Sequence, residues 1–134
     1  MKTIETVDEI EAIAAQAPLF ARWQTQATKL PARSRNHASG GFEAGLSVNG
    51  LSGKSREILV GNLTEYHGIS GHVLLLVTGE EVATGSDNEP IIINAQIVGI
   101  ASEALLTEAR SEEQINRCRR ITDRGMRCLF GCID

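Results

Sequence analysis

The chain has 134 residues, of which 42% are hydrophobic and 22% are charged, and its formal net charge is −4. These values are typical of one globular domain covering residues 1–134 and argue against a disordered chain. Aromatic residues make up only 4%, which argues against nucleobase stacking, and the negative charge gives no reason to expect nucleic acid as a partner. No run reaches the roughly 18 apolar residues of a membrane span, so we expect a cytoplasmic protein without membrane contact, of a bacterium or a mobile element.

The first 30 residues have the pattern of helices. Thr6 to Glu9 form a capping box, in which a threonine caps the helix and a glutamate three residues later bonds back. Apolar residues then recur at helical spacing as far as Ala17, and again from Phe20 to Leu30. Pro18 lies between the two series and has no amide hydrogen to donate. This pattern predicts one kinked helix or two short ones.

Residues 31–41 change to small, polar and cationic side chains with a glycine pair, which predicts an exposed loop. The loop contains Arg33, Arg35 and His37. Loops of this composition can hold anions through guanidinium groups and backbone amides. The alternative is a solvated linker.

Alternating and apolar runs predict strands over 42–48 and 56–60, with Asn49-Gly50 as a hairpin turn between them. A turn at Ser52-Gly53-Lys54 competes with it. The strongest strand signals are residues 72–78 and 91–100, with Gly79-Glu80-Glu81 as a turn that follows the first. Strands joined by such short links must be antiparallel. We therefore expect an α+β fold, a mainly antiparallel sheet of four to five strands with helices at the N- and C-terminal ends.

The C-terminal third is rich in arginine. A capping box at Ser111 to Gln114 predicts a helix, on which Arg117, Arg120 and Arg124 share one face, and residues 101–110 before it could be helical or a loop. Arginine suits bidentate contacts with phosphate or carboxylate, so this face is a candidate site for an anion or an acidic protein partner. The loop with Arg33 would form the opposite wall. The alternative is a solvated helix face balanced by nearby acids.

The three cysteines, Cys118, Cys128 and Cys132, all lie near the C-terminus. An odd number favours reduced thiols, and the spacings lack the close pairs of a zinc site, so we expect no metal. The segment Met126 to Ile133 is too apolar to remain in water. We expect it to dock on the core or on another subunit, which would make the protein a homo-oligomer.

Catalytic motifs such as Gly-x-Ser-x-Gly, a phosphate-binding loop or Gly-x-Gly-x-x-Gly do not occur. Tyr66-His67-Gly68 resembles the Tyr-His-Gly element with which many ADP-ribosyltransferases hold NAD, although Ile69 stands where those families have Thr or Ser. The resemblance covers three residues of 134 and does not assign the chain to that family. It would imply an NAD-using enzyme with Glu89 as the catalytic glutamate.

Taken together, these observations favour a small non-enzymatic binding protein that needs no cofactor. It would capture a nucleotide-like anion or dock on an acidic protein partner. The residues expected to bind are Arg117, Arg120, Arg124, Arg33, Arg35 and His37. The alternatives are the NAD-using transferase and a purely structural assembly subunit.

Overall fold

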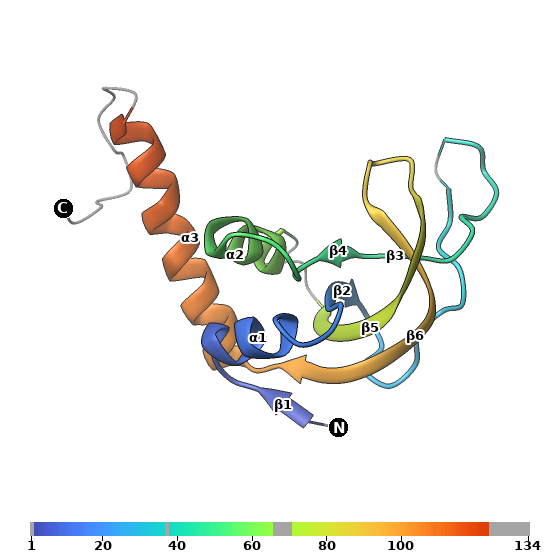
Figure 1. Cartoon of the computed structure of the whole chain (residues 1–134), viewed down its shortest axis with the longest axis horizontal. Helices are drawn as coiled ribbons and strands as arrows, with labels where there is room; N and C mark the ends of the chain where they lie inside the picture. The colour runs from blue at the N-terminus through green and yellow to red at the C-terminus, as the bar shows by residue number, and fades with distance from the viewer. Residues whose placement is uncertain (1, 37, 66–70, 124–134) are drawn as a thin grey trace.

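The computed structural model describes residues 2–36, 38–65 and 71–123 (Figure 1). Within them the chain forms six strands and three helices. In chain order these are β1 (Lys2–Ile4), α1 (Val7–Ala14), β2 (Phe20–Gln24), β3 (Leu46–Ser47), β4 (Asn49–Gly50), α2 (Arg56–Thr64), β5 (Val73–Thr84), β6 (Pro90–Ala101) and α3 (Glu103–Asp123).

The strands form one curled sheet in the order β1-β6-β5-β2-β4, with β3 paired to β6 beside this path. Every pairing is antiparallel except β1 with β6, which is parallel. The three helices gather toward one end of the molecule, and the turn between β5 and β6 lies toward the other (Figure 1). The predicted α+β class with a mainly antiparallel sheet and helices at both ends is confirmed.

Strands β5 and β6 confirm the two central strands that the sequence predicts, but both are longer than expected. The chain does not turn at Gly79 and instead continues to Thr84, with register shifts at three places along the ladder. Gly79 lies close to β6, because a Cβ there would come within 2.7 Å of Cδ1 of Ile92 and 3.1 Å of the backbone oxygen of Ile93. Opposite this region, Asn94 has a positive φ of 54°. These irregularities bend the hairpin and contribute to the curl of the sheet.

Alternation along β5 sends its apolar side chains to two separate cores. Leu74 and Leu76 pack in a helix-side core with residues of all three helices, among them Ile10, Leu63 and Leu105. A second cluster, the hairpin-side core, is formed on the other face of the strand. Its buried members are Phe20, Leu46, Val48, Leu75, Val77 and Ile92. A strand covered on both faces explains why its sequence is continuously apolar.

Two segments have a secondary structure that differs from the one the sequence predicts. Residues 20–24 form β2, not a helix, and lie between β4 and β5. Residues 56–64 form α2, not a strand, since Ser55 caps the helix with Oγ accepting from the amide of Ile58. Leu59, Val60 and Leu63 then bury one helical face, a pattern that the three-residue apolar run 58–60 cannot distinguish from a strand.

Three further boundaries differ from expectation. Asn49-Gly50 is not a hairpin turn but strand β4, which pairs with Phe20 and Ala21. The predicted strand 42–48 is reduced to Leu46–Ser47. Helix α3 begins at Glu103, because the Oγ of Ser102 accepts from the amide of Leu105 at 3.1 Å. Ser111, the predicted cap, lies inside this helix.

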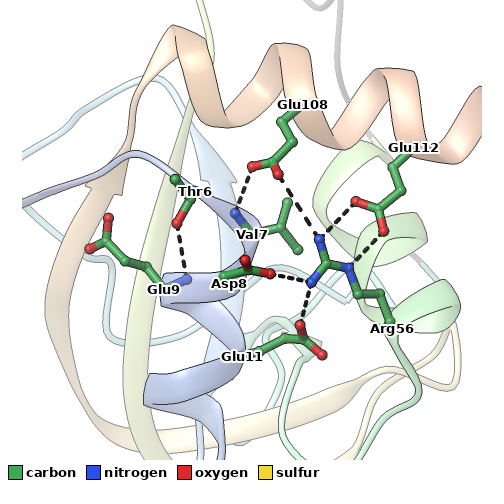
Figure 2. A network of polar contacts seen from close by, with 8 residues as sticks. All are labelled: Thr6, Val7, Asp8, Glu9, Glu11, Arg56, Glu108 and Glu112. Carbon is green, nitrogen blue, oxygen red and sulfur yellow. Dashed lines mark hydrogen bonds and ion pairs between the residues drawn. The ribbon is translucent and has the colours of Figure 1, made fainter.

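Helix α1 begins as predicted. The Oγ1 of Thr6 accepts from the amide of Glu9 at 3.1 Å, whereas the Glu9 carboxylate accepts from the amide of Glu5 and not from Thr6. A larger polar network surrounds this helix start (Figure 2). Its centre is Arg56 of α2, which contacts carboxylates of α1 and α3. Those carboxylates belong to Asp8, Glu11, Glu108 and Glu112.

Among the described helices, none is both long and apolar enough to cross a membrane. The expectation of reduced thiols is wrong for Cys118, which is buried in α3 and disulfide-bonded. Cys128, Cys132 and the segment 126–133, which the sequence predicts to mediate self-association, lie outside the described residues.

Candidate functional site

A cleft of about 490 Å³ opens between the β2–β3 loop, the β5–β6 turn and the C-terminal end of α2. This volume falls in the range of roughly 300–1,000 Å³ that is typical of small-molecule sites. Basic and acidic side chains both line the cleft. The basic residues are Arg22, Arg33, Arg35 and His72, and the acidic residues are Glu43, Glu65, Asp87 and Glu89.

The β2–β3 loop presents two of the arginines on a folded hairpin. Ser34 donates its amide to the carbonyl of Gly45 at 2.9 Å and accepts at its own carbonyl from the amide of Glu43 at 2.7 Å. Nearer the tip, Oδ1 of Asn36 accepts from the backbone amides of Ala38 and Ser39. These bonds order a segment whose composition alone indicated a loop.

Arg33 is fixed by backbone oxygens and by an aromatic ring. Its Nε donates to the carbonyl of Glu43 at 2.6 Å, and its Nη2 donates to the carbonyl of Phe42 at 3.4 Å. The guanidinium carbons of Arg33 and Arg35 lie 5.7 Å and 5.9 Å from the centroid of the Phe42 ring. Cation–π contacts of this kind are worth about 0.5–1 kcal/mol at exposed sites. Both arginines therefore lie against Phe42, and neither has a carboxylate partner among the described residues.

Arg22 lies on β2 and reaches across the sheet. Its Nη1 donates to the carbonyl of Ser47 at 2.9 Å, and its Nε donates to Oε1 of Gln24 at 3.4 Å. This places a third guanidinium group in the lining of the cleft. The neighbouring Trp23 also lines it, and the indole Nε1 is buried with no hydrogen-bond partner among the described residues.

Two acidic groups come from the β5–β6 turn. The turn is closed by the Gly85 amide, which donates to the carbonyl of Glu89 at 2.8 Å, and Asn88 has a positive φ of 63°. Oε1 of Glu89 accepts from the amide of Asp87 at 3.3 Å. The carboxylate of Glu89 also lies against Gly85, where a Cβ would come within 1.7 Å of Oε1.

The other two carboxylates are held by neighbouring donors. Oε1 of Glu43 accepts from the amide of Ser86 at 3.3 Å, which connects the arginine hairpin to the β5–β6 turn. Oε2 of Glu65, at the end of α2, accepts from the side-chain amide of Asn49. In the described chain no group of three or more His, Cys, Asp or Glu residues is arranged to hold a metal ion.

The structure separates the two halves of the predicted binding site. Arg33 and Arg35 line the cleft, whereas α3 lies at the opposite end of the long axis of the molecule (Figure 1). The expectation that the loop forms a wall opposite the helix is therefore wrong. The sequence left this distance open because contacts between segments so far apart depend on the fold of everything between them.

On α3 itself, Arg117 is exposed and Arg120 is ion-paired. Arg120 contacts Glu57 of α2 and, at 3.2 Å, Glu113 of its own helix. The hydrogen bond to Glu57, followed by that to Glu113, raises the pKa of Arg120. Arg124 and His37, the remaining predicted binding residues, lie outside the described residues.

Several residues that line the cleft were not predicted from the sequence as binding residues. Arg22 lies in a segment whose apolar spacing indicated a helix, although the four residues 21–24 alternate between apolar and polar side chains as in a strand. Glu65, His72 and Asp87 carry no motif, and only the folding of α2 and the β5–β6 turn brings them to the same cleft as Arg33.

Comparisons of the chain with protein-family models, with curated proteins and with solved structures find no match. Tyr66-His67-Gly68, which resembles the NAD-holding element of ADP-ribosyltransferases, lies outside the described residues. Glu89, the glutamate that this resemblance would make catalytic, lines the cleft.

Proposed function

We propose that this chain is a small binding protein that captures an anionic, nucleotide-like molecule in the cleft. The observation that carries the proposal is the state of Arg33 and Arg35. Both line the cleft, and neither forms an ion pair with a carboxylate in the described part of the chain.

The contrast with the helical arginines supports this interpretation. Arg56 and Arg120 are each engaged by two or more carboxylates, as expected for arginines that stabilise a fold. Arg33 is instead held by carbonyl oxygens and by Phe42, contacts that orient the group without neutralising its charge. Pre-orientation lowers the entropy cost of gripping a phosphate or carboxylate.

Isothermal titration calorimetry with adenosine 5′-monophosphate, ribose 5-phosphate and NAD tests the proposal. Each charge-assisted contact is worth roughly 1.5–3 kcal/mol, so Arg33→Ala or Arg35→Ala should weaken binding about tenfold or more. Arg→Lys at either position should also weaken it, because lysine keeps the charge but loses the planar fork.

A charge-matched control removes two exposed arginines from α3. The double variant Arg110→Ala, Arg119→Ala lowers the net charge by the same amount as the double variant of Arg33 and Arg35. It should bind as the wild type does. The proposal is wrong if none of the three probes binds, or if both double variants lose affinity equally.

A second candidate function is the NAD-using transferase, and the position of Glu89 in the cleft favours it. In that case Glu89→Gln should abolish turnover of NAD while leaving NAD binding nearly intact. Chromatographic detection of nicotinamide released from NAD would distinguish the transferase from the binding protein. Absence of nicotinamide with the wild type, under conditions in which NAD is bound, contradicts the enzyme proposal and leaves the binding proposal in place.

A further inference from the structure

We infer that the ligand of this cleft is bipolar: an anionic group faces Arg33 and Arg35, and an amino group that donates hydrogen bonds faces Asp87 and Glu89. This inference rests on the proposed function and specifies its ligand class as a nucleotide whose base carries an exocyclic amine.

Acidic and basic side chains line the same cleft and do not neutralise each other. Arg33 and Arg35 on one loop, and Asp87 and Glu89 on the other, all line it. No ion pair joins the two loops in the described residues, although Arg56 and Arg120 elsewhere pair with several carboxylates. The two walls of the cleft therefore carry opposite charges that are not paired with each other in the described residues.

Hydrogen bonds to backbone groups hold the two loops. Glu43 connects them with both ends of one residue, because its carbonyl accepts from Nε of Arg33 and its carboxylate accepts from the amide of Ser86. On the far loop, the Glu89 carboxylate is directed by the amide of Asp87. One charged side chain of each wall, Arg33 and Glu89, is therefore positioned by a hydrogen bond to the backbone, and Glu43 connects the two loops that carry them.

The two oppositely charged walls favour a ligand with two chemically different ends. A ligand with only negative charge would be repelled by Asp87 and Glu89, and a ligand with only positive charge would be repelled by the arginines. A molecule with a phosphate at one end and N–H donors at the other would satisfy both walls. An amine-bearing nucleotide has these two groups at opposite ends of one molecule.

The experiment compares two nucleotides that differ only in the amine. Adenosine 5′-monophosphate carries the exocyclic amine, whereas purine riboside 5′-monophosphate has a hydrogen in its place. We expect the wild type to bind the adenosine compound about tenfold or more tightly, the value of one hydrogen bond to a charged acceptor.

The double variant Asp87→Asn, Glu89→Gln should lose this discrimination, so that the two affinities approach each other. Glu89→Gln keeps an oxygen that can accept from the amide of Asp87, and the turn should therefore be retained. Glu80→Gln with Glu81→Gln, two exposed glutamates of β5 outside the cleft lining, is the matched control and should preserve the tenfold preference.

The possible results separate the two proposals. Equal affinity of the wild type for both nucleotides would overturn the bipolar ligand and leave anion capture standing. A preference that survives in the double variant would also overturn it, because the amine would then be recognised elsewhere. If neither nucleotide nor ribose 5-phosphate binds, the proposed function itself fails and this inference with it.

Discussion

The Nε of Arg56 donates to Oε1 of Glu112 at 2.6 Å, a bond that ties the first residue of α2 to the middle of α3. The same guanidinium group reaches Asp8 at 2.5 Å and also contacts Glu11, both on α1 (Figure 2). Glu108 completes the arrangement, because its Oε1 accepts from the amide of Val7 at 2.8 Å. One cation therefore joins all three helices.

Replacement of Arg56 by alanine should destabilise the protein, since four carboxylates would then face one another without a cation. The Arg56 side chain is 34% exposed, so the expected loss is roughly 1–2 kcal/mol, between the values of exposed and buried pairs. Urea unfolding followed by circular dichroism measures it. Arg56→Lys should lose less, and a loss below that of the exposed Arg110→Ala control would contradict the role given to the network.

Alkaline pH should not weaken this network. Hydrogen bonds that Arg56 donates to Glu112 and then to Asp8 raise the pKa of Arg56. A group whose folded pKa is raised contributes stability that is fully present below its unfolded pKa and is lost only as pH rises through the folded value. The unfolded pKa of arginine already lies well above this working range of pH, so the wild type minus Arg56→Ala difference should stay constant from about pH 7 to pH 10. A difference that shrinks over this interval would contradict the assignment.

Gly45→Ala should disturb both the fold and the cleft. A Cβ at this position would lie 2.2 Å from the carbonyl oxygen of Ile92, a backbone atom that cannot move aside cheaply. We expect a loss of about 1–3 kcal/mol, as for other overpacked sites, together with weaker ligand binding, because the Gly45 carbonyl anchors Ser34. Gly41→Ala is the control, since its nearest atom, Oγ of Ser39, is 3.6 Å away. Equal effects of the two substitutions would refute the explanation.

Two serines distinguish the observed start of α3 from the predicted one. Ser102→Ala should cost about 0.5–2 kcal/mol, because it removes the cap that accepts from the amide of Leu105. Ser111→Ala should be neutral or slightly stabilising, since alanine is the better helix former at an exposed interior position. Thermal unfolding of the two variants side by side checks both expectations. The reverse order would place the helix start at Ser111.

Long apolar strands were predictable because glycine and proline bound them and because β-branched residues fill 91–100. The segments whose secondary structure was predicted wrongly were short. Residues 56–60 contain too few apolar positions to separate a strand from a helix, and the decision is made by the Ser55 cap and by burial of Leu63. At 20–24, neighbouring β5 imposes the strand through its ladder, a contact about fifty residues away in sequence that local spacing cannot report.

The candidate site was half predictable for a similar reason. Arg33 and Arg35 stand in a loop whose composition is unusual enough to identify. Asp87 and Glu89 belong to another polar loop, and only the curl of the β5–β6 hairpin brings that loop against the first. The arginines of α3 attracted attention by their number, but the acids that engage Arg120 come partly from α2, a segment predicted as a strand.

The division of the interior between a helix-side core and a hairpin-side core affects how this protein can evolve. Leu74 and Leu76 face the first, and Leu75 and Val77 face the second, so substitutions on the two sides meet different partners. Val48 belongs to the hairpin-side core and also lines the cleft. Under the proposed function, repacking around Val48 would therefore change the ligand preference of the cleft and leave the helix-side core intact.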